Sequence, residues 1–127
     1  MLINFAIKVV RDALFNFGRY EVFNLFDSTS RGTVEINCRE TTAYRLKLST
    51  GVGNYQQRYL QNGVDVLAYN LYKDASFQTI WGDGSYLDEQ IFTHNGVMKY
   101  DVHGKIVAGQ NVSVGAYSDV IVIILEY

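Results

Sequence analysis

Short stretches in which apolar and polar residues alternate recur along this chain, and a period of two is typical of a half-buried β-strand. The clearest stretches lie at residues 3–10, 33–38, 44–48, 67–72 and 97–105. Turn-forming residues at 27–32, 61–63 and 95–96 separate them. The pattern predicts an all-β fold, an immunoglobulin-like antiparallel β-sandwich, in which segments 33–38 and 44–48 form an antiparallel pair.

The last segment, 120–125, differs from the others because it is apolar on both faces. Such a strand is expected to be flanked by other strands and covered on both sides, or to line a groove that another strand must fill. The alternation in the first segment predicts an edge or half-exposed strand. The candidates for a groove or for strand exchange are therefore Ile3, Phe5, Ile7 and Val9 at the start of the chain, and Val120, Val122 and Ile124 at its end.

The stretch 69–84 joins a predicted strand to a loop that carries three large apolar residues, Phe77, Ile80 and Trp81. Asp74 favours a turn because its carboxylate can bond nearby backbone, and Asp83-Gly84 favours a second, tight turn. Burial of each large side chain is worth roughly 1.5 to 3 kcal/mol. We therefore expect Trp81 to anchor the loop on the core, and the alternative is a ring that stacks on a sugar.

Length and charge restrict the classes of function. The chain has 127 residues, which suit one domain over 1–127, and a net charge of −2. Its Lys and Arg residues are spread singly, so we expect no nucleic-acid partner. The first ten residues lack the cationic start and cleavage site of a signal peptide, and no apolar run is long enough for membrane insertion.

Candidate chemistry is sparse. His94 and His103 lie in different segments without zinc-ligand spacing, and Ser118-Asp119 lacks the surroundings of a nucleophilic serine. The acidic residues Asp74, Asp83, Asp88 and Glu89 lack the spacing of a calcium loop. We predict no catalytic residue, no cofactor and no metal, and hence no enzyme.

Five segments in order resemble the spore coat protein U domain, which is shared by that coat protein and by subunits of archaic chaperone-usher pili. The central one is Tyr-Asn-Leu-Tyr-Lys-Asp-Ala at 69–75, followed by Trp-Gly-Asp-Gly at 81–84. The others are Phe-Gly-Arg-Tyr at 17–20, Gly-Thr-Val-Glu-Ile-Asn-Cys at 32–38, Gly-Lys-Ile-Val-Ala-Gly-Gln at 104–110 and Gly-Ala-Tyr-Ser-Asp at 115–119. The motif residues carried by this resemblance are Phe17, Gly18, Tyr69, Asp74, Trp81, Gly82, Asp83 and Gly84.

The resemblance implies a pilin-like sandwich that a strand from another subunit completes. It also implies a disulfide between Cys38 and the first strand, but this chain has no second cysteine, so Cys38 is either buried or free to cross-link. We favour burial, because Cys38 shares the inward face of Val34 and Ile36.

The function that this resemblance implies is a non-catalytic structural subunit of an extracellular bacterial assembly, an archaic chaperone-usher pilus or a spore coat. The implied partners are other copies or related subunits, a periplasmic chaperone and an outer-membrane usher, and the implied location is the cell surface, reached through the periplasm. The alternative is a secreted adhesin or carbohydrate-binding module whose exposed aromatic residues contact a surface.

Overall fold

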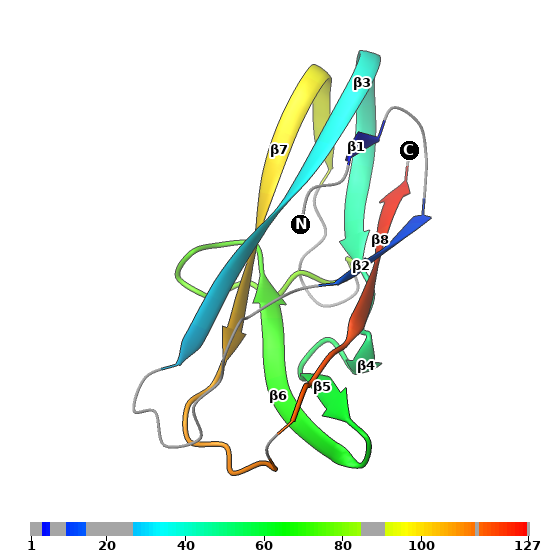
Figure 1. The fold of residues 1–127 in the computed structure, drawn as a ribbon. Coiled ribbons are helices and arrows are strands. Elements are labelled where there is room, and N and C mark those ends of the chain that lie inside the picture. Colours follow the sequence, from blue (N-terminus) through cyan, green and yellow to red (C-terminus); the bar gives the residue numbers. More distant parts are fainter. Residues whose placement is uncertain (1–3, 6–9, 15–26, 85–90, 114, 127) are drawn as a thin grey trace.

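The structure is a computed structural model that describes residues 4–5, 10–14, 27–84, 91–113 and 115–126. Every regular element in these ranges is a β-strand (Figure 1). The strands are β1 (Asn4–Phe5), β2 (Val10–Leu14), β3 (Ser28–Leu48), β4 (Val52–Gly53), β5 (Arg58–Asn62), β6 (Asp65–Tyr72), β7 (Phe92–Ile106) and β8 (Val120–Glu126).

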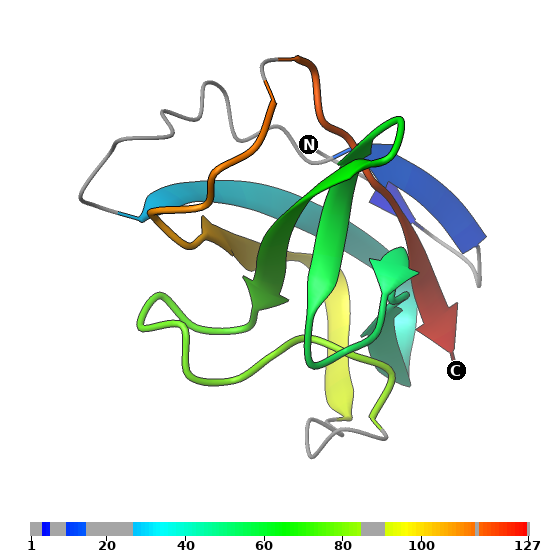
Figure 2. The same cartoon turned by 90° about the horizontal axis from the view of Figure 1, so that it is seen from below.

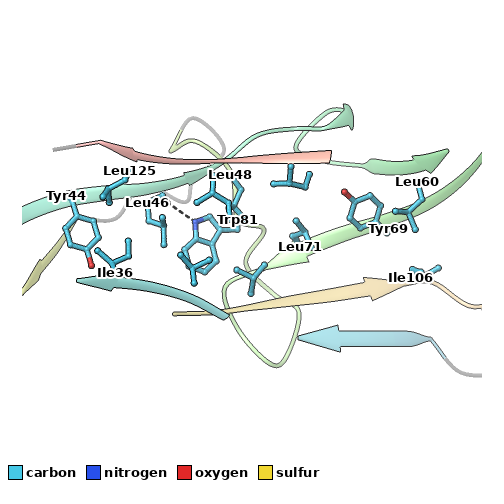
Figure 3. Packing of buried hydrophobic residues seen from close by; sticks show 14 of the residues in the cluster. Ile36, Tyr44, Leu46, Leu48, Leu60, Tyr69, Leu71, Trp81, Ile106 and Leu125 are labelled. Atoms are coloured by element: carbon cyan, nitrogen blue, oxygen red, sulfur yellow. Dashed lines mark hydrogen bonds between the residues drawn. The ribbon is translucent and has the colours of Figure 1, made fainter. Parts of the chain in front are cut away.

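The strands follow the order β2-β8-β3-β7-β6-β5-β4, and all these neighbours are antiparallel. β1 is the exception, because it runs parallel to β3. Most of β3 pairs with β7, but its last residues, Arg45 to Leu48, pair with β8. β3 therefore belongs to both layers, and the core lies between β8 with the end of β3 on one side and β7 with the start of β3 on the other (Figure 3). The predicted immunoglobulin-like β-sandwich is confirmed.

The expectation that 33–38 and 44–48 form two paired strands is wrong. Both segments belong to the single strand β3, and both pair with neighbouring strands instead of with each other. The register with β7 shifts between Cys38 and Thr42, so the intervening residues form a bulge. Residues 39–42 contain no Gly, Pro, Asn or Asp that would reverse the chain.

The turn predicted at residues 95–96 is also wrong, because both residues lie inside β7. Gly96 has a φ of +76° and pairs with Cys38 at the edge of the bulge. Glycine adopts a positive φ at no steric cost. At Gly96 this conformation accommodates an irregularity within the strand and does not reverse the chain.

The N-terminal segment differs from the single strand expected at 3–10. The structure describes two short strands there, β1 alongside β3 and β2 alongside β8 (Figure 2). Phe5 lies in β1 at the register position of Ile36. Ile3, Ile7 and Val9 lie outside the described residues, as do Phe17 and Gly18.

The core combines aliphatic side chains from both layers with a few aromatic rings. Alternation in β3 buries Val34, Ile36 and Cys38 before the bulge and Tyr44, Leu46 and Leu48 after it, so the predicted inward faces are confirmed. The remaining core residues are Leu60, Leu67, Tyr69, Leu71, Trp81, Val102, Ile106, Ile121, Ile123 and Leu125.

Candidate interaction site

β8 is the element that the sequence singled out, and it lies between β2 and β3 in the sheet. Ile121, Ile123 and Leu125 face the core and are buried. The candidate groove residues face the other way: Val120 is 48% exposed, and Val122 and Ile124 are half-buried. The strand therefore has a neighbour from its own chain along each edge, while its outer apolar face is only partly covered.

β8 pairs in register with both of its neighbours. The end of β3 supplies Leu46 and Leu48 opposite Leu125 and Ile123, so this pair is apolar on the core side. β2 instead places Arg11 at the register position of Ile123 and Asp12 at that of Val122.

A buried polar pair holds the start of β8. Asp119, which precedes the strand, is 8% exposed and accepts a hydrogen bond of 2.6 Å from the Tyr69 hydroxyl. Its other oxygen accepts from the backbone N–H groups of Val52 and Val120, at 3.0 and 2.8 Å. Burial, reinforced by the bond to Asp119, raises the pKa of Tyr69 well above its ordinary value. The hydroxyl is therefore a permanent donor at neutral pH.

Gly51 makes room for this pair. Its φ is +54°, and a Cβ at this position would lie 2.2 Å from Oδ2 of Asp119. Only glycine therefore lets the chain pass this closely beside the carboxylate.

Arg58 in β5 is fully buried and ties several segments together. Its guanidinium donates two hydrogen bonds to the Ser49 carbonyl, at 3.1 and 2.7 Å, and one of 2.7 Å each to the Trp81 carbonyl and to Oδ1 of Asn70. Sequence reasoning assigned no role to Arg58. The available signal was its spacing, because Arg58 is two residues from Leu60 and so faces the core with it.

Trp81 is 2% exposed and spans the space between the layers (Figure 3). Its ring nitrogen donates to the Leu46 carbonyl at 2.9 Å, and its backbone N–H donates to the Leu71 carbonyl at 2.9 Å. Trp81 is thus the core anchor that the sequence predicts. A ring buried to this degree has no face free to stack on a sugar.

The remaining motif residues surround Trp81. Gly82 is buried and its carbonyl accepts from the Leu48 N–H at 3.1 Å, while Asp83 and Gly84 follow in a bend in which Gly84 has a φ of +92°. Asp74 organises the loop before Trp81 by accepting from the N–H groups of Gln78 and Thr79. The Ser76 hydroxyl and these N–H groups hold the pKa of Asp74 below its ordinary value.

The other residues considered for catalysis or metal binding contact neighbouring residues of the fold, where the structure describes them. His94 shares a hydrogen bond of 2.9 Å with the Tyr44 hydroxyl, and His103 lies edge-on to Phe77. Ser118 pairs through its backbone with Gln61, and Cys38 is buried with a free thiol. Asp88 and Glu89 lie outside the described residues. Within the described ranges, no group of three His, Cys, Asp or Glu side chains is placed to hold a metal ion.

The fold and this strand arrangement define the class, an immunoglobulin-like β-sandwich. Residues 8–124 match the family model of the Spore Coat Protein U domain, so the chain belongs to that family, as its motifs predict.

Solved structures share the fold. One similar chain comes from the crystal structure of the CsuC-CsuE chaperone-tip adhesion subunit pre-assembly complex, from archaic chaperone-usher Csu pili of Acinetobacter baumannii. The TM-score is 0.60 at 18% identity, and the match covers 94% of this chain but 40% of that one. A search of curated proteins finds no match. None of the described residues forms a helix long and apolar enough to cross a membrane.

Proposed function

We propose that this domain is a non-catalytic structural subunit of an extracellular bacterial assembly, an archaic chaperone-usher pilus or a spore coat. Membership of the Spore Coat Protein U domain family over residues 8–124 supports this proposal. The fold shared with a chain of the chaperone-tip subunit complex supports it further. Its partners would be further subunits, a periplasmic chaperone and an outer-membrane usher, and its location the cell surface, reached through the periplasm.

The finer proposal is that subunits join by donor-strand complementation beside β8. The observation that carries it is the register between β2 and β8, in which Arg11 and Asp12 are opposite Ile123 and Val122. An incoming strand with apolar residues at these positions would match β8 better than β2 does. In this proposal β2 is a provisional neighbour, and the donor strand takes its place.

The energy available to such a donor is large. Each inserted apolar side chain is worth roughly 1.5 to 3 kcal/mol when it is fully buried. Three or four such side chains would contribute an amount comparable to the stability of a whole domain, about 5 to 15 kcal/mol. Exchange of β2 for an apolar strand would be favourable if this contribution exceeds the cost of ordering the donor and of losing the pairing of β2 with β8.

The alternative of a secreted adhesin is less well supported by the structure. Its strongest sequence argument was an aromatic ring available for a sugar, and Trp81 is buried. Among the residues that the structure describes, the large apolar side chains with the highest exposure are instead aliphatic ones and Met98, and Val64 is 99% exposed. These do not define a sugar site, because sugars stack on aromatic faces.

The proposal is tested by light scattering over a range of concentrations, combined with hydrogen exchange of the β8 amides. Donor-strand exchange predicts oligomers that grow with concentration, with β8 amides more protected in oligomers than in the monomer. A peptide of residues 1–10, which lacks the charges of β2, serves as a soluble donor, and a scrambled peptide is the control. A monomer at all concentrations, with β8 protection unaffected by either peptide, would contradict the proposal.

A further inference from the structure

β7 extends beyond the end of β6. The last pair of their ladder joins Tyr72 to His103, and β7 reaches from there back to Phe92 (Figure 1). Along this part, β7 pairs with β3 on one edge. No other strand in the described part of the chain pairs with its second edge. That edge of residues 92–102 is therefore open.

The pairing of β6 shows which residues of β7 turn their backbone groups to the open edge. The Leu71 carbonyl accepts from the Trp81 N–H at 2.9 Å, on the edge of β6 that β7 does not occupy. Successive residues of a strand point to opposite edges, so Tyr72 points to His103, and His103 points back to it. The same alternation turns every second residue before His103 to the open edge, namely Asp101, Lys99 and Val97.

The open edge also carries exposed apolar side chains. Met98 is opposite Ile36, so its side chain lies on the core face, while that of Val97 lies on the outer face. Met98 is 46% exposed and Val97 is 56% exposed. A strand added to this edge would cover both side chains and bond the backbone groups beside them.

The corresponding edge of β6 is closed by a side chain. The ladder with β7 ends at Tyr69, opposite Ile106, and Ala68 lies just beyond it. The Gln110 side-chain amide accepts from the Ala68 N–H at 2.7 Å and donates to the Ala68 carbonyl at 2.8 Å. Among the described residues, no side chain bonds the backbone of Lys99 in this way. The two edges that the partial overlap of β6 and β7 creates are thus treated differently.

Two-fold symmetry restricts how the open edges of two copies of the chain can pair. Antiparallel strands exchange hydrogen bonds only between residues that face the shared edge, here Val97, Lys99 and Asp101 of each copy. In the central register, Lys99 lies opposite Lys99 of the second copy. Every other register is shifted from this one along the strand.

The shifted registers are blocked on both sides. A shift in one direction, with Lys99 opposite Asp101, brings Val97 of each copy opposite His103, where β6 already pairs. A shift in the other direction, with Lys99 opposite Val97, gives Asp101 the partner Asn95. That residue lies where the register between β3 and β7 shifts, so the strand is irregular there. Only the central register uses the straight part of the edge alone.

We propose that the open edge of β7 is a latent self-association surface, and that Lys99 prevents a second copy from pairing with it. In the central register the two Lys99 side chains are directly opposite each other, and like charges in that position are destabilising. Asp101 of the second copy is a diagonal neighbour at the longer distance of about 7 to 8 Å, and its direct partner is Val97. Glu35 lies 4.0 Å from Lys99, but the Lys99 side chain is 65% exposed, so this ion pair leaves most of its charge effective.

This surface is distinct from the strand that the proposed function concerns, because β3 separates β7 from β8 in the sheet. Association through β8 would be common to all the samples described below. A difference between those samples therefore reports on the edge of β7 alone, and the proposal does not depend on donor-strand exchange.

Charge reversal at position 99 tests the proposal. The unsubstituted chain and Lys99→Glu each place like charges at the centre of the pair, so neither should pair through this edge by itself. An equimolar mixture places Lys99 opposite the introduced carboxylate. We expect sedimentation equilibrium at low salt to give the mixture a dissociation constant at least tenfold lower than that of either component, and added salt to reduce this difference.

Arg31→Glu is the matched control. Arg31 lies opposite His103 on the same outer face, one strand away from the edge, and its side chain is 67% exposed. The substitution makes the same change in charge, and it brings a carboxylate near Asp101 as Lys99→Glu brings one near Glu35. A mixture of Arg31→Glu with the unsubstituted chain should associate no more than its components do.

A Lys99→Glu mixture that associates no more than its components would overturn the proposal. A second measurement needs no substitution and so does not depend on the folding of a variant. In the unsubstituted chain, the amides of Val97, Lys99 and Asp101 should exchange hydrogen at least tenfold faster than those of Met98 and Tyr100, which point to β3. Equal protection of the two groups would equally overturn the proposal, because the edge would then be closed.

Discussion

The hydroxyl of Tyr69 in β6 and the carboxylate of Asp119 before β8 meet in a buried hydrogen bond of 2.6 Å between residues 50 positions apart in the chain. The bond connects the two layers of the sandwich at the point where β8 begins. Both residues belong to segments that resemble family motifs, Tyr69 to the central one and Asp119 to the last one. This one hydrogen bond therefore joins two of the motifs.

Alkaline pH should weaken the fold through this contact. The pKa of Tyr69 is raised above its ordinary value of about 10, and so is that of Tyr44, in both cases mainly by burial. A raised pKa means that the stabilisation is fully present below pH 10 and is lost as the pH rises beyond it. We expect the free energy of unfolding, measured with denaturant between pH 8 and 11, to fall above about pH 10. Tyr69→Phe should reduce the slope of this fall, and an unchanged slope would contradict the prediction.

Replacement of Gly51 by alanine should destabilise the protein more than the same change at Gly63. Both glycines have a positive φ, +54° and +60°, so backbone strain is similar. A Cβ at 51 would clash with Asp119, whereas nothing lies within 4 Å of a Cβ at 63. We expect Gly63→Ala to cost about 1 kcal/mol and Gly51→Ala about 2 kcal/mol more. Equal denaturant midpoints for the two variants would show that the loop moves aside freely.

Loss of the Trp81 ring should leave a large cavity between the layers. We expect Trp81→Ala to cost about 3 to 5 kcal/mol in the free energy of unfolding. Trp81→Phe keeps most of the volume and removes the hydrogen bond to the Leu46 carbonyl, so it should cost less. Denaturant unfolding of both variants checks this order. A Trp81→Ala variant with an unchanged midpoint would mean that the ring contributes no packing energy.

Removal of the charges from β2 should make β2 pair more tightly with β8. With Arg11→Val/Asp12→Val, β2 would offer β8 apolar residues at both positions, so the added donor peptide should bind at least tenfold more weakly. The matched control Arg11→Lys/Asp12→Glu keeps the charges and should bind as the original chain does. Calorimetric titration with the peptide measures both. Equal affinities for the two variants would show that β2 does not compete with the donor.

The sequence predicts this fold well where one face of a strand is apolar and the other polar. Alternation directly predicts the buried positions within 34–38 and 44–48. The size of the Trp81 side chain predicts that it anchors its loop on the core. Strand boundaries are less predictable. The residues around Gly96 are equally compatible with a turn and with a bulge, because a glycine with a positive φ occurs in both. Only the pairing with Cys38 across the strands distinguishes them.

The candidate site was only partly predictable for a similar reason. The sequence identified β8 as unusual, because two apolar faces need two covers. It did not identify Arg58, since an arginine in a short strand is usually solvated, and two of its three acceptors are the backbone carbonyls of Ser49 and Trp81. A backbone carbonyl acceptor cannot be identified from residue types, because every residue has one.

The membership of β3 in both layers has a mechanical consequence. No loop separates the part that pairs with β7 from the part that pairs with β8, so a tensile load that draws the layers apart acts on one continuous backbone. The exposed bulge at 39–41 lies in this backbone before the pairing with β8 begins at Arg45. Within the described strands, β3 is thus a covalent link through which a load on one layer is carried directly to the other.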